Sequence, residues 1–271
     1  MSADGLCKRI IPCLDVAGGK TVKGINFGNL REIGDPVELG RFYQEQGADE
    51  LTFLDISASN EDRSTVVDLV RAVAANLSIP FTVGGGVSSL DLVKRLLENG
   101  ADKVSINTAA VNRPQLIEEI AGTCGSQCCV VALDVRRSDG KGLKRRVGNG
   151  GENGTAWEVL IRGGRVTTGR DALDWALECV ERGAGEILLT SWDKDGTLDG
   201  FDIELTKIFS QRLSVPVIAS GGARDPDSFV EVFQDGQADA ALAASIFHDG
   251  MYTIGAVKDQ LHKAGVPVRL C

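Results

Sequence analysis

The sequence has few of the side chains that hold metal ions. It contains only two histidines, His248 and His262, and its seven cysteines include no Cys-x-x-Cys pair. Structural zinc sites are normally built from closely spaced cysteines and histidines, so the spacing argues against one. We expect no metal and no cofactor, and we expect the cysteines to be reduced thiols that pack as small hydrophobic groups where they lie in apolar runs.

Long apolar runs and an excess of positive charge are also missing. No run approaches the roughly 18 apolar residues that a membrane-spanning helix needs, and residues 1–5 form no apolar signal region. The formal net charge of −9 argues against a surface that binds nucleic acid or anionic membrane. We therefore expect a cytoplasmic protein in which any bound phosphate belongs to a small molecule.

What is present is a regular alternation of strand-like and helix-like segments. The chain has 271 residues, of which 43% are hydrophobic and 25% charged, as is usual for a soluble globular domain. Eight apolar segments read as strands, each followed by a segment with helical spacing: 9–15, 51–54, 79–83, 103–106, 128–134, 186–190, 215–219 and 238–243. Such continuously apolar strands indicate a parallel sheet that is covered on both sides. We predict a single (β/α)8 TIM barrel, with an open, doubly wound sheet as the alternative.

The sequence also repeats itself. Thr-Val-Gly-Gly-Gly-Val at 82–87 and Ile-Ala-Ser-Gly-Gly-Ala at 218–223 are similar, and Glu50 and Glu186 lie 136 residues apart, as do Gly85 and Gly221. The repeat predicts two similar half-barrels, about 1–122 and 123–271, within one domain 1–271. The second half has an insertion at 136–168 that is rich in glycine, arginine and lysine. It shows no apolar period, which predicts a lid, a binding loop or a disordered segment.

Each glycine-ended strand predicts a place where backbone amides approach an anion. Glycine lacks a Cβ, and a helix that begins beside it favours negative charge. A tight turn is the ordinary alternative for one such stretch, but two equivalent copies on opposite sides of a barrel favour two phosphate sites. The predicted phosphate-site residues are Gly85, Gly86, Asn107 and Thr108 in the first half, and Ser220, Gly221, Gly222, Ala244 and Ser245 in the second. Weaker candidates in nearby loops are Lys23, Asp195 and Gly196.

Two aspartates close equivalent strands. Asp15 follows the apolar run at 10–14, and Asp134 follows the run at 129–133. In a barrel of this kind the C-terminal ends of the strands form the active-site face. Poor solvation there raises the pKa of a carboxyl group toward values useful in proton transfer. The alternative for either residue alone is a solvated aspartate at a strand end, but the pair predicts one acid and one base acting on the middle of a bisphosphate.

Four charged residues begin strands at the opposite end. Side chains alternate along a strand, so if Asp15 points into the barrel, Arg9 does too. The same alternation places Lys103 inside when Asn107 points inward, and Glu50 and Glu186 occupy equivalent positions in the repeat. From the pattern alone, a ring of alternating charges that stabilises the bottom of the barrel is the favoured interpretation.

Several motifs resemble the cyclase subunit of imidazole glycerol phosphate synthase, an enzyme of histidine biosynthesis. The resemblance covers essentially the whole chain, and the motifs that carry it lie at 10–16, 22–27, 34–39, 81–87, 101–110, 183–191, 195–197 and 219–223. Trp192 and Arg224 depart from the family pattern near the expected substrate mouth.

The resemblance implies an ammonia-dependent cyclase and lyase. Its substrate would be a doubly phosphorylated ribulosyl aminoimidazole-carboxamide, and its products imidazole glycerol phosphate and an aminoimidazole carboxamide ribotide. Asp15 matches the general acid of the family, Asp134 the general base, and Lys23 a lysine that closes over the substrate. Arg9, Glu50, Lys103 and Glu186 match a gate for ammonia, supplied by a glutaminase subunit that docks at the N-terminal face and forms a heterodimer.

Two other functions remain open on the sequence. The sister isomerase of the pathway is also a doubled barrel with two phosphate sites and an aspartate pair, but Cys13-Leu14-Asp15 and Lys-Gly-Ile-Asn-Phe at 23–27 favour the cyclase. A phosphate-binding barrel without catalytic activity is the other possibility. The presence of both Asp15 and Asp134 argues against it, and turnover would exclude it.

Overall fold

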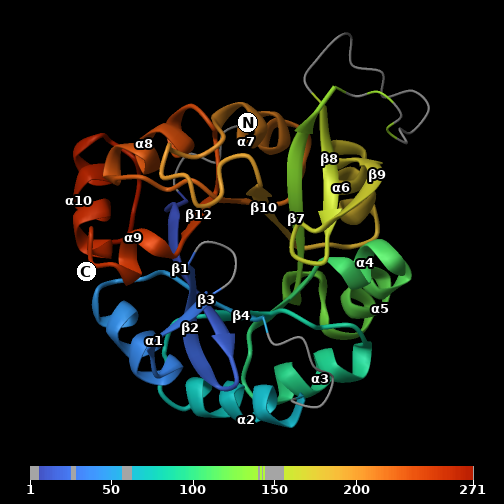
Figure 1. The fold of residues 1–271 in the computed structure, drawn as a ribbon, viewed down its shortest axis with the longest axis horizontal. Coiled ribbons are helices and arrows are strands. Elements are labelled where there is room, and N and C mark those ends of the chain that lie inside the picture. Colours follow the sequence, from blue (N-terminus) through green and yellow to red (C-terminus); the bar gives the residue numbers. More distant parts are fainter. Residues whose placement is uncertain are drawn as a thin grey trace.

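Eight parallel strands close into a barrel in the computed structural model, which describes residues 6–25, 29–56, 63–139, 141, 143 and 156–270 (Figure 1). Around the barrel they are β1 (Arg9–Ala17), β4 (Leu51–Asp55), β5 (Phe81–Gly84), β6 (Lys103–Ile106), β7 (Cys129–Ser138), β10 (Glu186–Ser191), β11 (Val217–Ser220) and β12 (Ala240–Ala243). The last strand, β12, pairs back onto β1, with Ala240 opposite Arg9. An open sheet would leave these two edges unpaired, so the predicted closed barrel is confirmed.

The longer helices form the outer ring in Figure 1. They are α1 (Pro36–Glu45), α2 (Arg63–Ala74), α3 (Leu90–Glu98), α5 (Gln115–Cys124), α6 (Ala172–Glu181), α7 (Ile203–Arg212), α8 (Pro226–Gln234) and α10 (Ile254–Lys263). Asp35 and Asp225, each followed by a proline in the first turn, accept hydrogen bonds from the first-turn amides of α1 and α8. Two short helices, α4 (Thr108–Asn112) and α9 (Ser245–His248), follow β6 and β12 directly.

The hydrophobic core has two layers, and the alternation of side chains along each strand separates them. On β1, Ile10 and Leu14 pack outward under the helices, whereas Ile11 and Cys13 belong to a cluster inside the barrel. The inner cluster also contains Val130, Leu188, Ile218, Ala240 and Leu242. The barrel interior is therefore packed, and space for a ligand remains only toward its ends.

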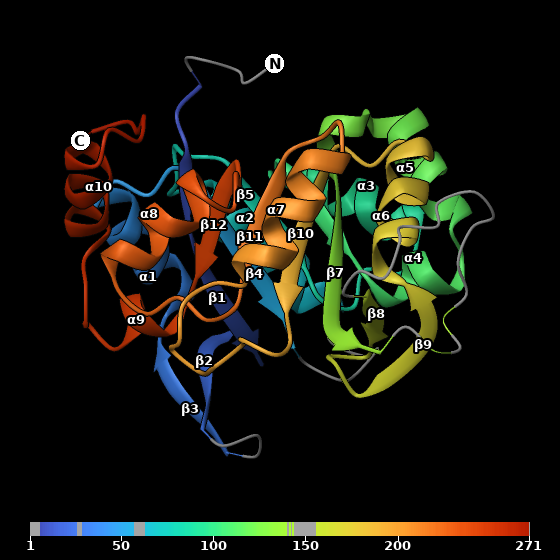
Figure 2. The same ribbon diagram turned by 90° about the horizontal axis from the view of Figure 1, so that it is seen from above.

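Two antiparallel hairpins extend the barrel at the end where its strand arrows point (Figure 2). The strands β2 (Lys20–Ile25) and β3 (Asn29–Gly34) continue from β1, and β8 (Ala156–Ile161) and β9 (Val166–Asp171) continue from β7. The second hairpin corrects the prediction for 136–168. The segment Ala-Trp-Glu-Val-Leu-Ile is a largely buried strand, because its apolar side chains pack beside β7. Residues 140, 142 and 144–155 of that insertion lie outside the described residues.

The two halves of the barrel use glycine in the same way. A Cβ on Gly85 would lie 1.9 Å from the carbonyl oxygen of Asp55, at the end of β4, and a Cβ on Gly221 would lie 2.8 Å from that of Ser191, at the end of β10. Both glycines have positive φ. This similarity is in line with the predicted half-barrels, whose boundary near residue 122 stays a prediction. In the described part of the chain, no helix is long and apolar enough to cross a membrane.

Candidate active site

Asp15 and Asp134 line the same cavity, at the C-terminal ends of opposite strands β1 and β7. The cavity has a volume of about 230 Å³. The other predicted site residues that line it are Asp195, Gly196, Ser220, Gly221, Gly222, Ala244 and Ser245. It is completed by Cys13, Leu54, Thr190, Trp192, Leu198, Ala223, Leu242, Ala243 and Ile246. The structure thus brings together both aspartates and the predicted phosphate site of the second half.

The two carboxyl groups have perturbed proton affinities. Burial raises the pKa of Asp15 to about 6, and the negative charge of Asp195 contributes to the rise. Burial likewise raises the pKa of Asp134 to about 6, with a contribution from Asp195 that a hydrogen bond from Asn107 partly opposes. Burial also raises the pKa of Asp195 itself. Among the described residues, the charged side chains that line the cavity are these three acids, and burial raises the pKa of each, so the site favours an incoming cation or proton.

Asn107 and Thr108 lie beside the cavity at the end of β6. The Asn107 Nδ2 donates a hydrogen bond to Asp134 Oδ2 at 3.0 Å, while its own Oδ1 is buried and has no hydrogen-bond partner among the described residues. The Thr108 hydroxyl oxygen accepts a hydrogen bond from the backbone N–H of Arg162, in the β8–β9 turn. The unpartnered Oδ1 is a place where a bound molecule could donate a hydrogen bond.

The predicted glycines differ in the space around the position where a Cβ would be. Gly85 is required by the close backbone of Asp55, so its lack of a Cβ already has a structural reason. Gly86, with φ of +63°, has no atom of the described residues within 4 Å of where a Cβ would be, so the space on that side of it is open. In the second half, Gly222 is confined by the carbonyl oxygen of Gly200 at 2.3 Å. Gly85 and Gly86 do not line the 230 Å³ cavity.

Trp192 and Thr190 are cavity residues that were not among the predicted site residues. Side chains alternate along β10, so Thr190 points to the same side as Glu186, into the barrel. The sequence alone could therefore have identified Thr190 as a cavity residue. Trp192 follows β10, and a Cβ on Gly164 would lie 2.3 Å from its ring. The indole therefore packs directly against the β8–β9 turn, which a sequence pattern could not show.

Lys23 lies on β2, next to Val22, which pairs with Asp15. Its ammonium group is ion-paired with Asp249, directly after α9, and does not line the cavity. The predicted lysine is therefore near the mouth of the site, held by a residue for which no role was predicted.

The four charged residues at the opposite end form a closed ring of ion pairs. Arg9 Nη1 lies 2.6 Å from Glu50 and 2.8 Å from Glu186, and Lys103 Nζ lies 3.1 Å and 3.0 Å from the same two carboxylates. Each glutamate thus bridges both cations, and the side chains are between 9% and 21% exposed. The predicted ring geometry is present, closing the barrel interior below the inner cluster.

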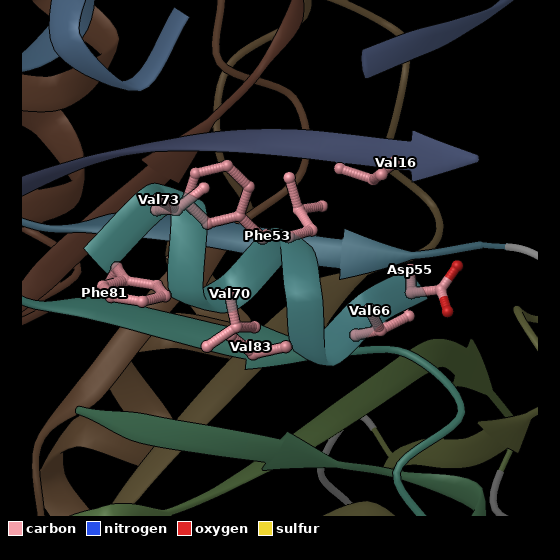
Figure 3. Close-up of a pocket in the computed structure, with 9 residues that line it drawn as sticks. Val16, Phe53, Asp55, Val66, Val70, Val73, Phe81 and Val83 are labelled. Carbon is pink, nitrogen blue, oxygen red and sulfur yellow. The ribbon is translucent and has the colours of Figure 1, made fainter. Parts of the chain in front are cut away.

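A second, smaller cavity lies outside the barrel, between α2 and strands β1, β4 and β5 (Figure 3). Its volume is about 20 Å³, and its walls are aliphatic and aromatic apart from Asp55 at one end. A space of this size holds at most about one water molecule, and its apolar walls offer water few partners. It is a packing gap rather than a ligand site. In the described part of the chain, no three His, Cys, Asp or Glu side chains gather as metal ligands.

Comparison with known proteins gives a consistent result. The family described as "Histidine biosynthesis protein" matches residues 9–253. The imidazole glycerol phosphate synthase subunit HisF of Halalkalibacterium halodurans is 56% identical over 264 residues, which are 97% of this chain and 100% of that protein. The proteins of the same name from Geobacillus thermodenitrificans and Anoxybacillus flavithermus are each 57% identical, with the same coverage. A match of this extent over a complete barrel leaves no room for a different family, and the chain belongs to the imidazole glycerol phosphate synthase HisF subunits of histidine biosynthesis.

Proposed function

We propose that this chain uses ammonia to convert the bisphosphorylated ribulosyl aminoimidazole-carboxamide into imidazole glycerol phosphate and the aminoimidazole carboxamide ribotide. The observation that carries the proposal is that Asp15 and Asp134, from opposite strands, line one cavity and have pKa values near 6. The reaction forms two carbon–nitrogen bonds to the ammonia nitrogen, loses the ketone oxygen of the ribulosyl group as water, and breaks a carbon–nitrogen bond to release the ribotide. Protons must therefore leave one group and reach another, which an aspartate pair of this kind can support.

The surroundings of the two acids support different roles for them. A hydrogen bond from Asn107 stabilises the ionised form of Asp134 and opposes the effect of burial on its pKa. No such bond acts on the pKa of Asp15, which burial and Asp195 raise. Asp134 is therefore the general base and Asp15 the general acid in our proposal.

The two phosphate groups would bind at the two glycine-ended strands. One would lie at Ser220, Gly221, Gly222, Ala244 and Ser245, which line the cavity. The other would lie near Gly86, Asn107 and Thr108, where the space beside Gly86 is open among the described residues. The unpartnered Asn107 Oδ1 is an acceptor, so it would bind a donor group of the substrate rather than the phosphate itself. The acids lie between these two places, which suits a substrate that carries a phosphate at each end.

The ion-pair ring at the opposite end supports a role in the passage of ammonia. The relatives are named as subunits, so a second subunit takes part in their enzyme. We propose that this partner is a glutaminase that docks at the N-terminal face and that ammonia passes between Arg9, Glu50, Lys103 and Glu186. The ring is the only part of the proposal that depends on the partner.

To test the proposal, the isolated chain is given the ribulosyl bisphosphate and an ammonium salt, and the formation of imidazole glycerol phosphate is measured. Asp15→Asn and Asp134→Asn should each lower kcat by at least about a hundredfold, the typical contribution of a general acid or base, while substrate still binds. Asp259→Asn, at an exposed position on α10, is the matched control. Unchanged substrate with the wild-type chain, or near-normal turnover in either active-site variant, would refute the proposal.

A further inference from the structure

One carboxylate holds two cations of the β2–β3 hairpin. Asp249 accepts a hydrogen bond from Lys23 Nζ, and its other oxygen lies 3.7 Å from Arg31 Nη2. Lys23 and Arg31 are opposite each other in the β2–β3 register, so they reach Asp249 from neighbouring strands. We call Lys23, Arg31 and Asp249 the rim cluster. Its net charge is +1.

Hydrogen bonds hold the backbone on which Asp249 lies. The preceding His248 donates a hydrogen bond from Nε2 to the Cys13 carbonyl oxygen at 2.8 Å, so its Nδ1 accepts one from the Tyr43 hydroxyl at 2.6 Å. Burial lowers the pKa of His248, which keeps the imidazole neutral and both bonds intact. The Asp249 amide also donates to the Ser245 carbonyl oxygen at 2.9 Å. The backbone that carries the carboxylate is thus fixed relative to β1 and α9.

The hairpin that carries the cations is held less firmly. Among the described strands, β3 pairs only with β2, and β2 joins the barrel through Asp15–Ala17 of β1. A lysine side chain also loses up to about 2 kcal/mol of conformational entropy when it is ordered. The rim cluster joins this outlying element to the α9 side of the mouth and orders the Lys23 side chain before any ligand arrives.

Among the described residues, a phosphate entering the cavity would otherwise meet only negatively charged side chains. The charged residues that line it are Asp15, Asp134 and Asp195. Ser245 begins α9, and Asp249 follows its last residue, four positions later, which is about 6 Å along a helix. Asp249 therefore ties the two cations to the end of the short helix that begins at Ser245, in the predicted phosphate site.

We propose that Asp249 is a positioning residue that holds Lys23 where it can bind the substrate phosphate at Ser245. This role rests on the proposed function, since it assigns the phosphate to that end of the cavity. Ordering the lysine in advance lowers the entropic cost of binding, and the anchored carboxylate sets where the ammonium group lies. Arg31 offsets the negative charge of Asp249, so the cluster still attracts an anion.

The kinetic test compares Asp249→Asn, Asp249→Glu and the exposed control Asp259→Asn, with an ammonium salt as nitrogen source. Asp249→Asn should raise KM about two- to fivefold, the range that a partly exposed ion pair supports, and leave kcat within about twofold. Asp249→Glu should have a KM close to that of the wild type, because glutamate keeps the negative charge that pairs with Lys23. In a Lys23→Gln background, Asp249→Asn should raise KM no further.

Three kinetic outcomes would overturn the role. An unchanged KM in Asp249→Asn would show that the ion pair does nothing for binding. A lowered KM would show that Asp249 competes with the phosphate for Lys23. If Asp249→Asn raised KM by the same factor in the Lys23→Gln background as in the wild type, Asp249 would not act through the lysine.

Hydrogen exchange on the substrate-free chain separates this role from the proposed function. Peptides covering β2 and β3 should exchange several times faster in Asp249→Asn than in the wild type, and at the wild-type rate in Asp249→Glu. Unchanged exchange in Asp249→Asn would overturn the positioning role whatever the turnover. Absent turnover in the wild-type chain would instead overturn the proposed function.

Discussion

Asn107 donates one amide hydrogen bond to Asp134 and leaves its carbonyl oxygen buried without a partner among the described residues. The first feature biases the aspartate toward its ionised form, and the second leaves an acceptor at the wall of the candidate site. One side chain therefore links the proton affinity of the proposed base to a vacant hydrogen-bonding position. This arrangement makes the pH dependence of the reaction a direct test of the site.

Replacing Asn107 by Leu should raise the pKa of Asp134 above its present value of about 6, because burial and Asp195 then act without the opposing hydrogen bond. A base must be ionised to work, so activity should rise with pH at a higher value than in the wild type. The measurement is the pH profile of kcat/KM, whose limbs belong to the coupled pair rather than to single residues. A rising limb that stays in place would show that the bond has no influence on the base.

Replacing Asp195 by Asn should lower the pKa of both Asp15 and Asp134, since the Asp195 charge contributes to both shifts. Activity should then rise at a lower pH, because the base ionises earlier, and fall at a lower pH, because the acid loses its proton earlier. The same pH profile reports both limbs. Displacement of the two limbs in opposite directions would contradict a shared electrostatic cause.

The two catalytic candidates should also lower stability above neutral pH. Their folded-state pKa values of about 6 lie above the value of about 4 for an unfolded chain, so the folded protein binds the proton more tightly. The free energy of unfolding therefore falls as pH rises from about 4 to 6 and stays reduced above that. Two units correspond to about 3 kcal/mol, and solvent in the open cavity reduces this to about 1–2 kcal/mol.

Asp15→Asn and Asp134→Asn should accordingly raise the free energy of unfolding by about 1–2 kcal/mol at pH 8. The gain should shrink as the pH is lowered from 7 to 5, because the wild-type carboxyl groups become neutral there. Urea unfolding at several pH values measures both effects. A loss of stability in both variants at pH 8 would mean that the ionised carboxylates are well stabilised in the fold.

The sequence was enough to predict the barrel and the aspartate pair, but not the β8–β9 hairpin or the ion pair at Asp249. Asp15 and Asp134 were found because each follows an apolar run at the end of a predicted strand. The β8–β9 hairpin was missed because its six-residue apolar strand lies in a segment dominated by glycine and arginine. Asp249 could not be found at all, since its ion pair with Lys23 joins positions 226 residues apart.

The prediction that Gly85 and Gly86 bind phosphate also depends on contacts that the sequence does not show. Gly85 and Gly86 look equivalent in the sequence, and both have positive φ. The structure separates them, because only Gly85 faces the backbone of Asp55 at close range. A pattern shows that a Cβ is absent, whereas the reason depends on which neighbour the fold brings near.

The ion-pair ring predicts a different behaviour for Glu186. Glu186→Gln leaves Arg9 and Lys103 with Glu50 as their remaining anion in the ring, and breaking such a buried network should cost about 2–4 kcal/mol of unfolding free energy. If ammonia passes through the ring, turnover that depends on glutamine and the partner should change more than tenfold. Turnover with an ammonium salt, which can enter at the open mouth, should change less than about threefold. Equal changes with both nitrogen sources would refute the gate and leave a stabilising role.

Two adjacent glycines in the β8–β9 turn provide a matched pair for testing how Trp192 is held. Gly163 and Gly164 have φ of +62° and +75°, so replacing either by Ala strains the backbone by a similar amount, about 1–2 kcal/mol. A Cβ on Gly163 meets no described atom within 4 Å, whereas one on Gly164 lies 2.3 Å from the Trp192 ring. Gly164→Ala must therefore displace the indole, which lines the candidate site.

Relative to Gly163→Ala, the Gly164→Ala variant should lose a further 1–3 kcal/mol or so of unfolding free energy, in the range for overpacking. It should also alter tryptophan fluorescence and raise KM, because the wall of the cavity moves. Gly163→Ala should keep the wild-type fluorescence and KM. Identical behaviour of the two variants would show that the β8–β9 turn yields to the added methyl group and does not fix the position of Trp192 at the mouth.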